Sequence, residues 1–482
     1  MSPFLVFIVI ASYFGLLILI SYFTAKKSNS ASFFTANKQS PWFLVAFGMI
    51  GASLSGVTFI SVPGWVGTNN FYYFQMVLGY LVGYFVIATV LMPIYYRMNL
   101  VTIYTYLETR FGYWAYKTGS AFFLLSRVIG ASFRLFLVAG VLQIGFFDAF
   151  EIPFWITILV TISLIWVYTL KAGIKTIVWT DTLQTFFMLT AVIVTIVIIA
   201  KELNLNAGGI IDTVKNSDYS TMFNWEWQSK FNFFKQFIAG AFIAIVMTGL
   251  DQDMMQKNLT CRNIKDAKKN MFWFSITLVP VNLIFLSLGV LLYHYAAQSG
   301  ISLPESADEL YPFIALNHLS IFAGVIFLLG ITAAAFSSAD SALTALTTSF
   351  SVDFLNINVH EENNNINKTK RLVHIGFSLL LFFVILIFNA LNDESVVSAV
   401  FKAAGYTYGP ILGLFAFGLI TKLKVVDKAV PFIAVISPIL AFFIDAYSEQ
   451  LLFGYKFNFE LLVLNGALTF FGLLIFSKKD AS

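Results

Sequence analysis

Residues 42–64 read WFLVAFGMIGASLSGVTFISVPG. The segment is long and apolar enough to cross a hydrocarbon layer of roughly 30 Å as a helix. Its middle is crowded with small and hydroxyl-bearing residues, namely Gly48, Gly51, Ser53, Ser55, Gly56 and Thr58, and Pro63-Gly64 follows. This composition predicts a helix that is interrupted inside the membrane, which is typical of the binding sites of secondary transporters. The alternative is that the small residues only let neighbouring helices pack closely.

The rest of the chain supports a membrane protein. Of its 482 residues, 59% are hydrophobic and only 11% are charged, whereas a soluble domain carries about 25% charged residues. The apolar residues form long continuous runs, which favour helices over the alternating strands of a membrane barrel. We predict thirteen spans, at 4–24, 42–64, 71–96, 116–144, 153–170, 176–200, 234–252, 271–296, 320–350, 373–391, 396–420, 429–447 and 459–476.

The distribution of Lys and Arg gives the orientation. With the N-terminus outside, the predicted inner loops hold 20 of these residues and the outer loops hold 4. Such a bias places the C-terminus inside and indicates a multi-pass protein of the inner (plasma) membrane. The positive charge therefore reports topology and predicts no nucleic-acid partner. The single cysteine, Cys261, excludes an intramolecular disulfide.

The ninth span carries a polar helix face. Its members recur at helical spacing, at Ser337, Asp340, Ser341 and Thr344. A carboxylate inside a membrane is costly and usually functional, and hard cations prefer oxygen ligands. The alternative is a polar patch that joins helices.

Further charged residues lie within the predicted spans. Asp181 near the start of the sixth span either serves a site or caps its helix. Arg127 and Arg134 share one face of the fourth span, and Lys402 is a further predicted buried cation in the eleventh. Arginine binds carboxylates in a two-pronged manner. The alternative for each cation is an internal ion pair with Asp181 or Asp340.

Enzyme chemistry finds no support in the sequence. The four histidines, His294, His318, His360 and His374, are scattered and show no metal-ligand spacing. A phosphate-binding loop and the repeats of a selectivity filter are absent too. We therefore predict that the chain is not an enzyme, an ATP-driven pump or a channel.

Four motifs resemble those of the sodium/solute symporters, which include bacterial carriers of proline, galactose and sialic acid. They read TYLETRFG at 105–112, WTDTLQ at 179–184, DQDMMQ at 251–256 leading into DAKK at 266–269, and AAFSSADS at 334–341 ending at Asp353. The resemblance covers nearly the whole chain. One departure is Ala172-Gly173, where many members have two glycines.

The resemblance implies an all-α, LeuT-type fold in a single transmembrane domain that spans 1–482. Two inverted repeats of five helices would occupy 42–200 and 234–420. The first helix, 4–24, and the C-terminal helices, 429–476, would be peripheral. We expect a monomer embedded in lipid that works by alternating access and uses the sodium gradient.

The family's ion sites carry over residue by residue. The main sodium site would use the backbone carbonyls of Gly51, Leu54 and Ala334 and the hydroxyls of Ser337 and Ser338. A second sodium would lie near Asp181, Ser337, Asp340 and Ser341. Similar carriers have serine where Asp340 stands, so a proton in place of sodium is an alternative there.

The resemblance also suggests a substrate site. Arg134 matches the arginine with which sialic acid carriers hold the substrate carboxylate, and Ser53, Ser55 and Thr58 fall at hydroxyl positions. Gln75 and Lys402 are additional candidates. Apolar Val57 and Leu278 disfavour a galactose-type sugar. We predict a sodium symporter for an organic anion such as sialic acid. The alternatives are a neutral or zwitterionic solute, with Arg134 paired internally, and a non-transporting sensor.

Overall fold

A computed structural model describes residues 3–25, 35–169, 173–357, 364–391 and 395–478. The described residues are almost entirely helical, and all thirteen predicted segments fold as helices. Nine of these are long and apolar enough to cross a membrane, or up to eleven if each of two bent pairs is counted as one span. Two shorter apolar helices, Phe154–Trp166 and Leu461–Ile475, account for the remaining segments. Ala172, quoted above, lies outside the described residues.

The first half of the chain contains the following helices: α1 (Pro3–Ala25), α3 (Trp42–Asn69), α4 (Tyr73–Val86), α5 (Met92–Arg97), α6 (Thr105–Arg110), α7 (Tyr113–Leu142), α8 (Phe154–Thr169), α9 (Gly173–Glu202) and α10 (Ala207–Lys215). The second half contains α11 (Phe233–Ala244), α12 (Gln252–Asn258), α13 (Ile264–Gln298), α14 (Leu310–Phe313), α15 (Ile321–Ser349), α16 (Asn364–Leu391), α17 (Val396–Thr407), α18 (Gly409–Ile420), α19 (Val430–Ala446), α20 (Ser448–Leu451) and α21 (Leu461–Ile475). The two short strands, β1 (Lys424–Val425) and β2 (Ser477–Lys478), pair antiparallel.

The helical backbone of α3 is interrupted, as the sequence predicted. Ser55 has φ 49° and ψ 175°, which is outside the helical region, while the residues on both sides are helical. The break lies at the hydroxyl cluster and not at Pro63-Gly64, which belongs to the continuing second half. The last four carbonyls before such a break lose their intrahelical partners. Those of residues 51–54 are thereby available to a ligand.

Two more spans are sharply bent. The segments Phe233–Gly249 and Gln252–Asn258 meet at 69°, and α17 meets α18 at 48°. Asp251 begins α12 because its carboxylate accepts hydrogen bonds from the backbone N–H groups of Asp253 and Met254. Tyr408, at the second bend, donates its hydroxyl to the same carboxylate. A single buried carboxylate therefore joins the two bends.

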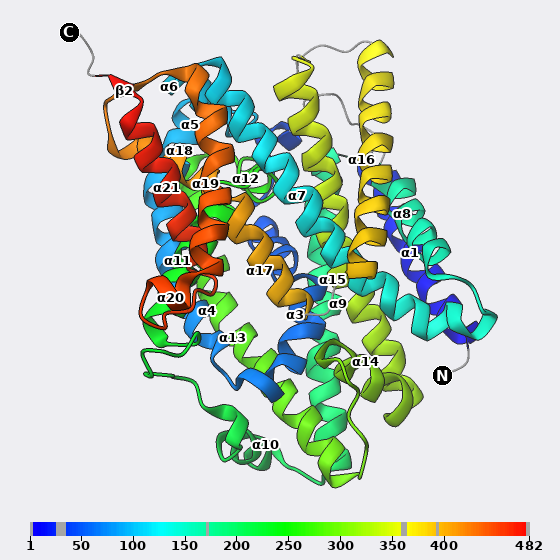
Figure 1. Cartoon of the computed structure of the whole chain (residues 1–482). Coiled ribbons are helices and arrows are strands. Elements are labelled where there is room, and N and C mark those ends of the chain that lie inside the picture. Colours follow the sequence, from blue (N-terminus) through cyan, green and yellow to red (C-terminus); the bar gives the residue numbers. More distant parts are fainter. Residues whose placement is uncertain (1–2, 26–34, 170–172, 358–363, 392–394, 479–482) are drawn as a thin grey trace.

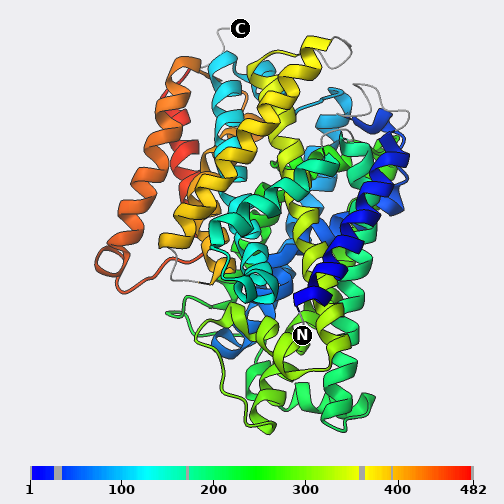
Figure 2. The ribbon, with the colours of Figure 1, turned by 90° about the vertical axis from the view of Figure 1, so that its right-hand side faces the viewer.

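The helices form a bundle whose interrupted helix is central. In the interior, α3, α9 and α15 pack against one another and α13 packs against α3 and α9. Helices α1, α8 and α16 lie at one flank and α19 and α21 at the opposite flank (Figures 1 and 2). Outward-facing side chains are apolar, such as Phe4 and Phe432, which are 70% and 71% exposed. This distribution suits a molecule whose outer solvent is hydrocarbon. The start of α1 and the end of the described chain lie at opposite ends of the bundle (Figure 1).

The C-terminal helices are fastened to α7. Asp427 accepts hydrogen bonds from the backbone N–H groups of Trp114, at 2.9 Å, and Ala115, at 2.8 Å. These are first-turn groups that have no partner within their own helix. Gly112 precedes them with φ 136°, and a side chain there would meet the Asp427 carboxylate. The flanking pair α19 and α21 is thus connected directly to the interior of the bundle.

Candidate functional site

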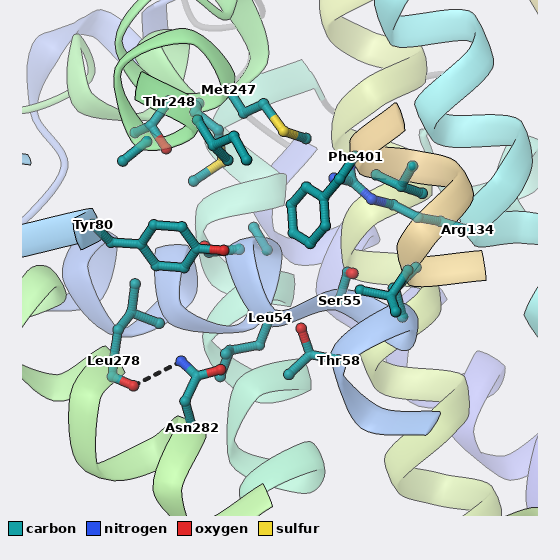
Figure 3. Close-up of a pocket in the computed structure, with 18 of the residues that line it drawn as sticks. Leu54, Ser55, Thr58, Tyr80, Arg134, Met247, Thr248, Leu278, Asn282 and Phe401 are labelled. Atoms are coloured by element: carbon teal, nitrogen blue, oxygen red, sulfur yellow. Dashed lines mark hydrogen bonds between the residues drawn. The ribbon is translucent and has the colours of Figure 1, made fainter. Parts of the chain in front are cut away.

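A cavity of about 70 Å³ lies beside the break in α3 (Figure 3). Seven helices, together with the turn that follows α11, line it: α3, α4, α7, α11, α12, α13 and α17. Its polar lining residues are Ser53, Ser55, Thr58, Tyr73, Tyr80, Tyr84, Arg127, Arg134, Thr248 and Asn282. The remaining lining residues are apolar and include Val57, Leu278 and Phe401. The mixture of apolar walls with a few polar groups is typical of small-molecule sites.

The two arginines of α7 differ in their partners. Arg127 forms ion pairs with Asp251, at 3.7 Å, and with Asp253. Its charge is therefore neutralised by the segment that begins α12. Arg134 is 8% exposed, and no carboxylate of the described residues lies within 4.0 Å of its guanidinium. Among those residues its Nε also has no hydrogen-bond partner. Within the described part of the chain, Arg134 is therefore a buried cation of the cavity wall that has no carboxylate at ion-pair distance.

The break in α3 lies against two other helices. A Cβ atom added at Gly56 would lie 3.6 Å from Ala335 of α15, and one added at Gly48 would lie 3.0 Å from Cβ of Asp181 on α9. The backbone N–H of Gly51 donates to Thr185 Oγ1 at 3.1 Å, and a side chain at Gly51 would overlap that oxygen. The glycines let α3 approach α9 at backbone distance. The freed carbonyls of α3 thus lie at a junction of three helices.

A polar network extends from this junction. Ser337 donates to Asp181 at 2.7 Å, and Lys257 of α12 forms an ion pair with the same carboxylate at 2.7 Å. Ser341, one turn further along α15, bonds to Asp253 at 3.2 Å. All of these side chains are almost completely buried. The network therefore joins α9, α12 and α15 through oxygen-rich contacts.

These contacts correct several expectations from the sequence. Arg127 pairs with Asp251 and Asp253 and not with Asp181 or Asp340. The capping role considered for Asp181 is wrong, because α9 begins at Gly173 and Asp181 lies more than two turns inside it. Its counter-ion is Lys257, which charge alone could not distinguish from the other loop lysines. Asp340 is buried on α15 beside the network.

Two substrate candidates lie away from the cavity. Gln75 is buried, but its amide bonds to the backbone of Tyr72, Phe231 and Asn224, and it does not line the cavity. Its amide therefore organises the loop before α11. Lys402 was predicted to be buried, yet it is exposed and does not line the cavity. The periodicity of α17 could not show which face of that helix meets the bundle.

Three residues of α3 that were predicted to bind the substrate do line the cavity, namely Ser53, Ser55 and Thr58. Arg134 of α7 lines it as well. Sequence reasoning missed Asn282, Thr248 and the tyrosines of α4. Tyr73 and Tyr80 form a hydroxyl pair at 3.2 Å, and their spacing of seven residues places them on one helix face. That spacing was a usable signal.

Comparison with known protein families assigns the chain to one of them. The model of the family described as "Sodium:solute symporter family" matches residues 33–426. The chain belongs to the sodium:solute symporter family. This membership agrees with the resemblance of the four motifs and explains the transporter-like site.

Individual relatives of this symporter are distant. The sodium/sialic acid symporter NanT of Aliivibrio fischeri is 25% identical over 439 residues, covering 86% of this chain and 83% of its own. The sodium/sialic acid symporter SiaT of Proteus mirabilis is 23% identical, covering 93% and 91% respectively. The human sodium/iodide cotransporter is 22% identical over 81% of this chain and 61% of its own.

Solved structures confirm the fold of the symporter. A substrate-bound, outward-open Na⁺-coupled sialic acid symporter superposes with a TM-score of 0.81 at 19% identity, over 98% of this chain and 99% of that one. Mhp1, a nucleobase-cation-symport-1 family transporter, gives a TM-score of 0.59 at 13% identity, over 93% and 94%. Both superpositions support the LeuT-like fold expected from the sequence.

Proposed function

We propose that this symporter imports an organic anion together with sodium, and that a sugar acid of the sialic acid type is the leading substrate class. One observation carries the choice of an anion. Arg134 is a buried guanidinium in the cavity wall, and no carboxylate of the described residues forms an ion pair with it. Burying a charge without a partner is costly. A substrate carboxylate supplies that partner, and the names of NanT and SiaT support the same class.

The main sodium ion is proposed to bind where α3 meets α15. Its ligands would be the carbonyls of Gly51, Leu54 and Ala334 and the hydroxyls of Ser337 and Ser338. The break at Ser55 supports this site because it frees the first two carbonyls. Ser337 gives its proton to Asp181, so its oxygen lone pairs remain available to a cation. Sodium prefers such oxygen ligands.

The second sodium site, at Asp181, Ser337, Asp340 and Ser341, remains a proposal with a restriction. Lys257 lies 2.7 Å from Asp181. A sodium ion there would share the Asp181 carboxylate with an ammonium group. The number of sodium ions per cycle therefore depends on Lys257.

The wider architecture is proposed from the same reasoning. Thirteen spans with the N-terminus outside would place inverted repeats at 42–200 and 234–420 in the inner membrane. The interrupted helix of the first repeat and the 69° bend near the start of the second support this division. Alternating access would then move the sodium and anion sites between the two sides together.

Uptake by proteoliposomes tests the function. We expect accumulation of N-acetylneuraminate with external sodium and none when choline replaces it. Arg134→Gln should lower uptake at least a hundredfold, because the substrate carboxylate and the cavity lose their charge partner. Arg97→Gln, an exposed arginine at the end of α5, and Lys402→Gln serve as controls and should leave uptake unchanged.

Two outcomes would contradict this assignment. Uptake that is equal in sodium and choline would exclude coupling to sodium. Uptake of carboxylates that survives Arg134→Gln would exclude the arginine as the anion site and favour a neutral solute.

A further inference from the structure

Asn282 is a buried amide with one unsatisfied atom in the cavity wall. Its side chain lies on α13 and is 1% exposed. The Nδ2 group donates to the carbonyl of Leu278, one turn earlier, at 2.8 Å (Figure 3). Its Oδ1 has no hydrogen-bond partner among the described residues. The amide is therefore held in a fixed orientation with a free acceptor.

A buried acceptor without a donor is unfavourable in a folded protein. The large majority of buried side-chain polar atoms are hydrogen-bonded, and each exception requires an explanation. Leucine or valine would fill the same volume without that cost. The amide is accounted for if a ligand supplies the missing donor when the cavity is occupied.

Arg134 and Asn282 form a complementary pair. Arg134 Nε is a donor without a partner among the described residues, and Asn282 Oδ1 is an acceptor without one. They belong to α7 and α13, and α3 packs against both of these helices. Ser55 and Thr58 of α3 lie between them in the view of Figure 3. A ligand that reaches from one to the other would cross the break in α3.

The surroundings of Asn282 indicate which kind of hydrogen-bond donor the ligand would supply. Leu278 and Leu54 give this end of the cavity apolar walls (Figure 3). The described residues that line the cavity include no carboxylate, which a cationic donor would need beside it. The acceptor on α13 therefore favours a neutral donor such as a hydroxyl or an amide N–H.

We propose that Asn282 is a specificity-determining residue whose Oδ1 accepts a hydrogen bond from a hydroxyl or N–H group of the transported anion, remote from the carboxylate that Arg134 binds. The proposal rests on the function assigned above. It narrows the substrate class to acids that carry such a donor, as hydroxylated or acylamino sugar acids do. Simple aliphatic monocarboxylates lack the donor and leave Oδ1 unpaired.

Ligand binding by the purified, sodium-loaded wild type and by an Asn282 variant tests the proposal. Isothermal titration would measure N-acetylneuraminate, a set of analogues that each replace one hydroxyl or the acetamido group by hydrogen, and propionate. We expect Asn282→Leu to weaken N-acetylneuraminate at least tenfold, because a site built around a polar contact discriminates strongly when that contact is lost. The analogue that lacks the group bonded to Asn282 Oδ1 should bind the wild type at least tenfold more weakly than N-acetylneuraminate does. Asn282→Leu should not weaken the binding of that analogue further.

The controls separate this proposal from the function itself. Ser275→Ala removes a buried hydroxyl of α13 that does not line the cavity, and it should bind like the wild type. The analogue series in the wild type provides the answer even if Asn282→Leu fails to fold. If every analogue binds the wild type within twofold of the parent, or if Asn282→Leu weakens propionate as much as N-acetylneuraminate, Asn282 sets no specificity. If neither acid binds in sodium, the assigned function fails instead.

Discussion

At the scale of single residues, the pairing of Lys257 with Asp181 decides how the buried charges balance. Both side chains are at most 2% exposed, and both come from segments that meet the sodium-binding region. Removing one partner of such a pair leaves an uncompensated charge and typically costs about 3–5 kcal/mol. The free energy of folding should therefore depend on which cation faces Asp181.

In the absence of sodium, we expect Lys257→Met to unfold at a lower temperature than the wild type. Added sodium should raise the unfolding temperature of the variant more than that of the wild type. Sodium can then provide the charge that Lys257 supplied, and ligand binding to the native state raises stability. Thermal unfolding in sodium and in choline measures both effects. The double variant Asp181→Asn, Lys257→Met serves as the control and should lose the additional sodium response. An unchanged sodium response in Lys257→Met would show that no cation competes for Asp181.

Residue types predicted part of the site but not its pairing. Arg134 was identified because an arginine inside a membrane span requires an anion. Arg127 carries the same signal, yet its partners lie 124 and 126 residues away at Asp251 and Asp253. A separation of that size cannot be read from helical spacing. Asn282 was missed because a lone asparagine in an apolar helix gives no sign of the face it occupies.

At the scale of elements, the interrupted helix α3 is the feature on which the sodium site depends. Ser55 adopts a positive φ, which is strained for any residue with a side chain and costs on the order of 1–3 kcal/mol. Contacts of Gly48, Gly51 and Gly56 with α9 and α15 hold the break in place. The strain is thus balanced by packing on both sides.

Substitutions at Ser55 should separate the break from the hydroxyl. Ser55→Val places a branched side chain at a positive φ, where it is most unfavourable, and should abolish the stabilisation of the protein by sodium. Ser55→Gly adopts the same backbone without strain and should keep the sodium response while weakening N-acetylneuraminate. Thermal unfolding with sodium, followed by titration with the acid, measures the two effects. Equal sodium responses in the two variants would contradict the role of the break.

The break could be predicted from composition, whereas its position could not. Small and hydroxyl residues at 48–58, with Pro63-Gly64 downstream, indicated an interruption but did not single out Ser55. The structure keeps Pro63 inside a continuous helix. Proline in a helix can be tolerated when neighbouring groups satisfy the freed backbone. Tertiary packing therefore determines where α3 is interrupted.

At the scale of the whole molecule, the charge distribution makes a prediction about topology. The short helix α10 lies at one end of the bundle and β2 at the other (Figure 1). If the N-terminus is outside, α10 faces the exterior and the loop between α12 and α13 faces the cytoplasm. The native Cys261 in that loop is fully buried, and burial raises the pKa of its thiol to about 12. It should remain protonated and unreactive at neutral pH.

Single introduced cysteines test this orientation. Lys215→Cys in α10 and Arg262→Cys beside the buried native cysteine both replace exposed side chains. We expect a membrane-impermeant maleimide to label the first in intact right-side-out vesicles and the second only after permeabilisation. The unmodified protein controls for labelling of Cys261. The opposite pattern would invert the proposed topology.

The contact of Asp427 with the start of α7 has a mechanical consequence. Trp114 and Ala115 give their backbone N–H groups to this carboxylate, so the linker that leads into α19 is locked to the helix that carries Arg134. During a conformational cycle, the flanking pair α19 and α21 should follow α7 as one rigid body. A spectroscopic label on α19 would then report the displacement of the anion-binding arginine from outside the translocation route.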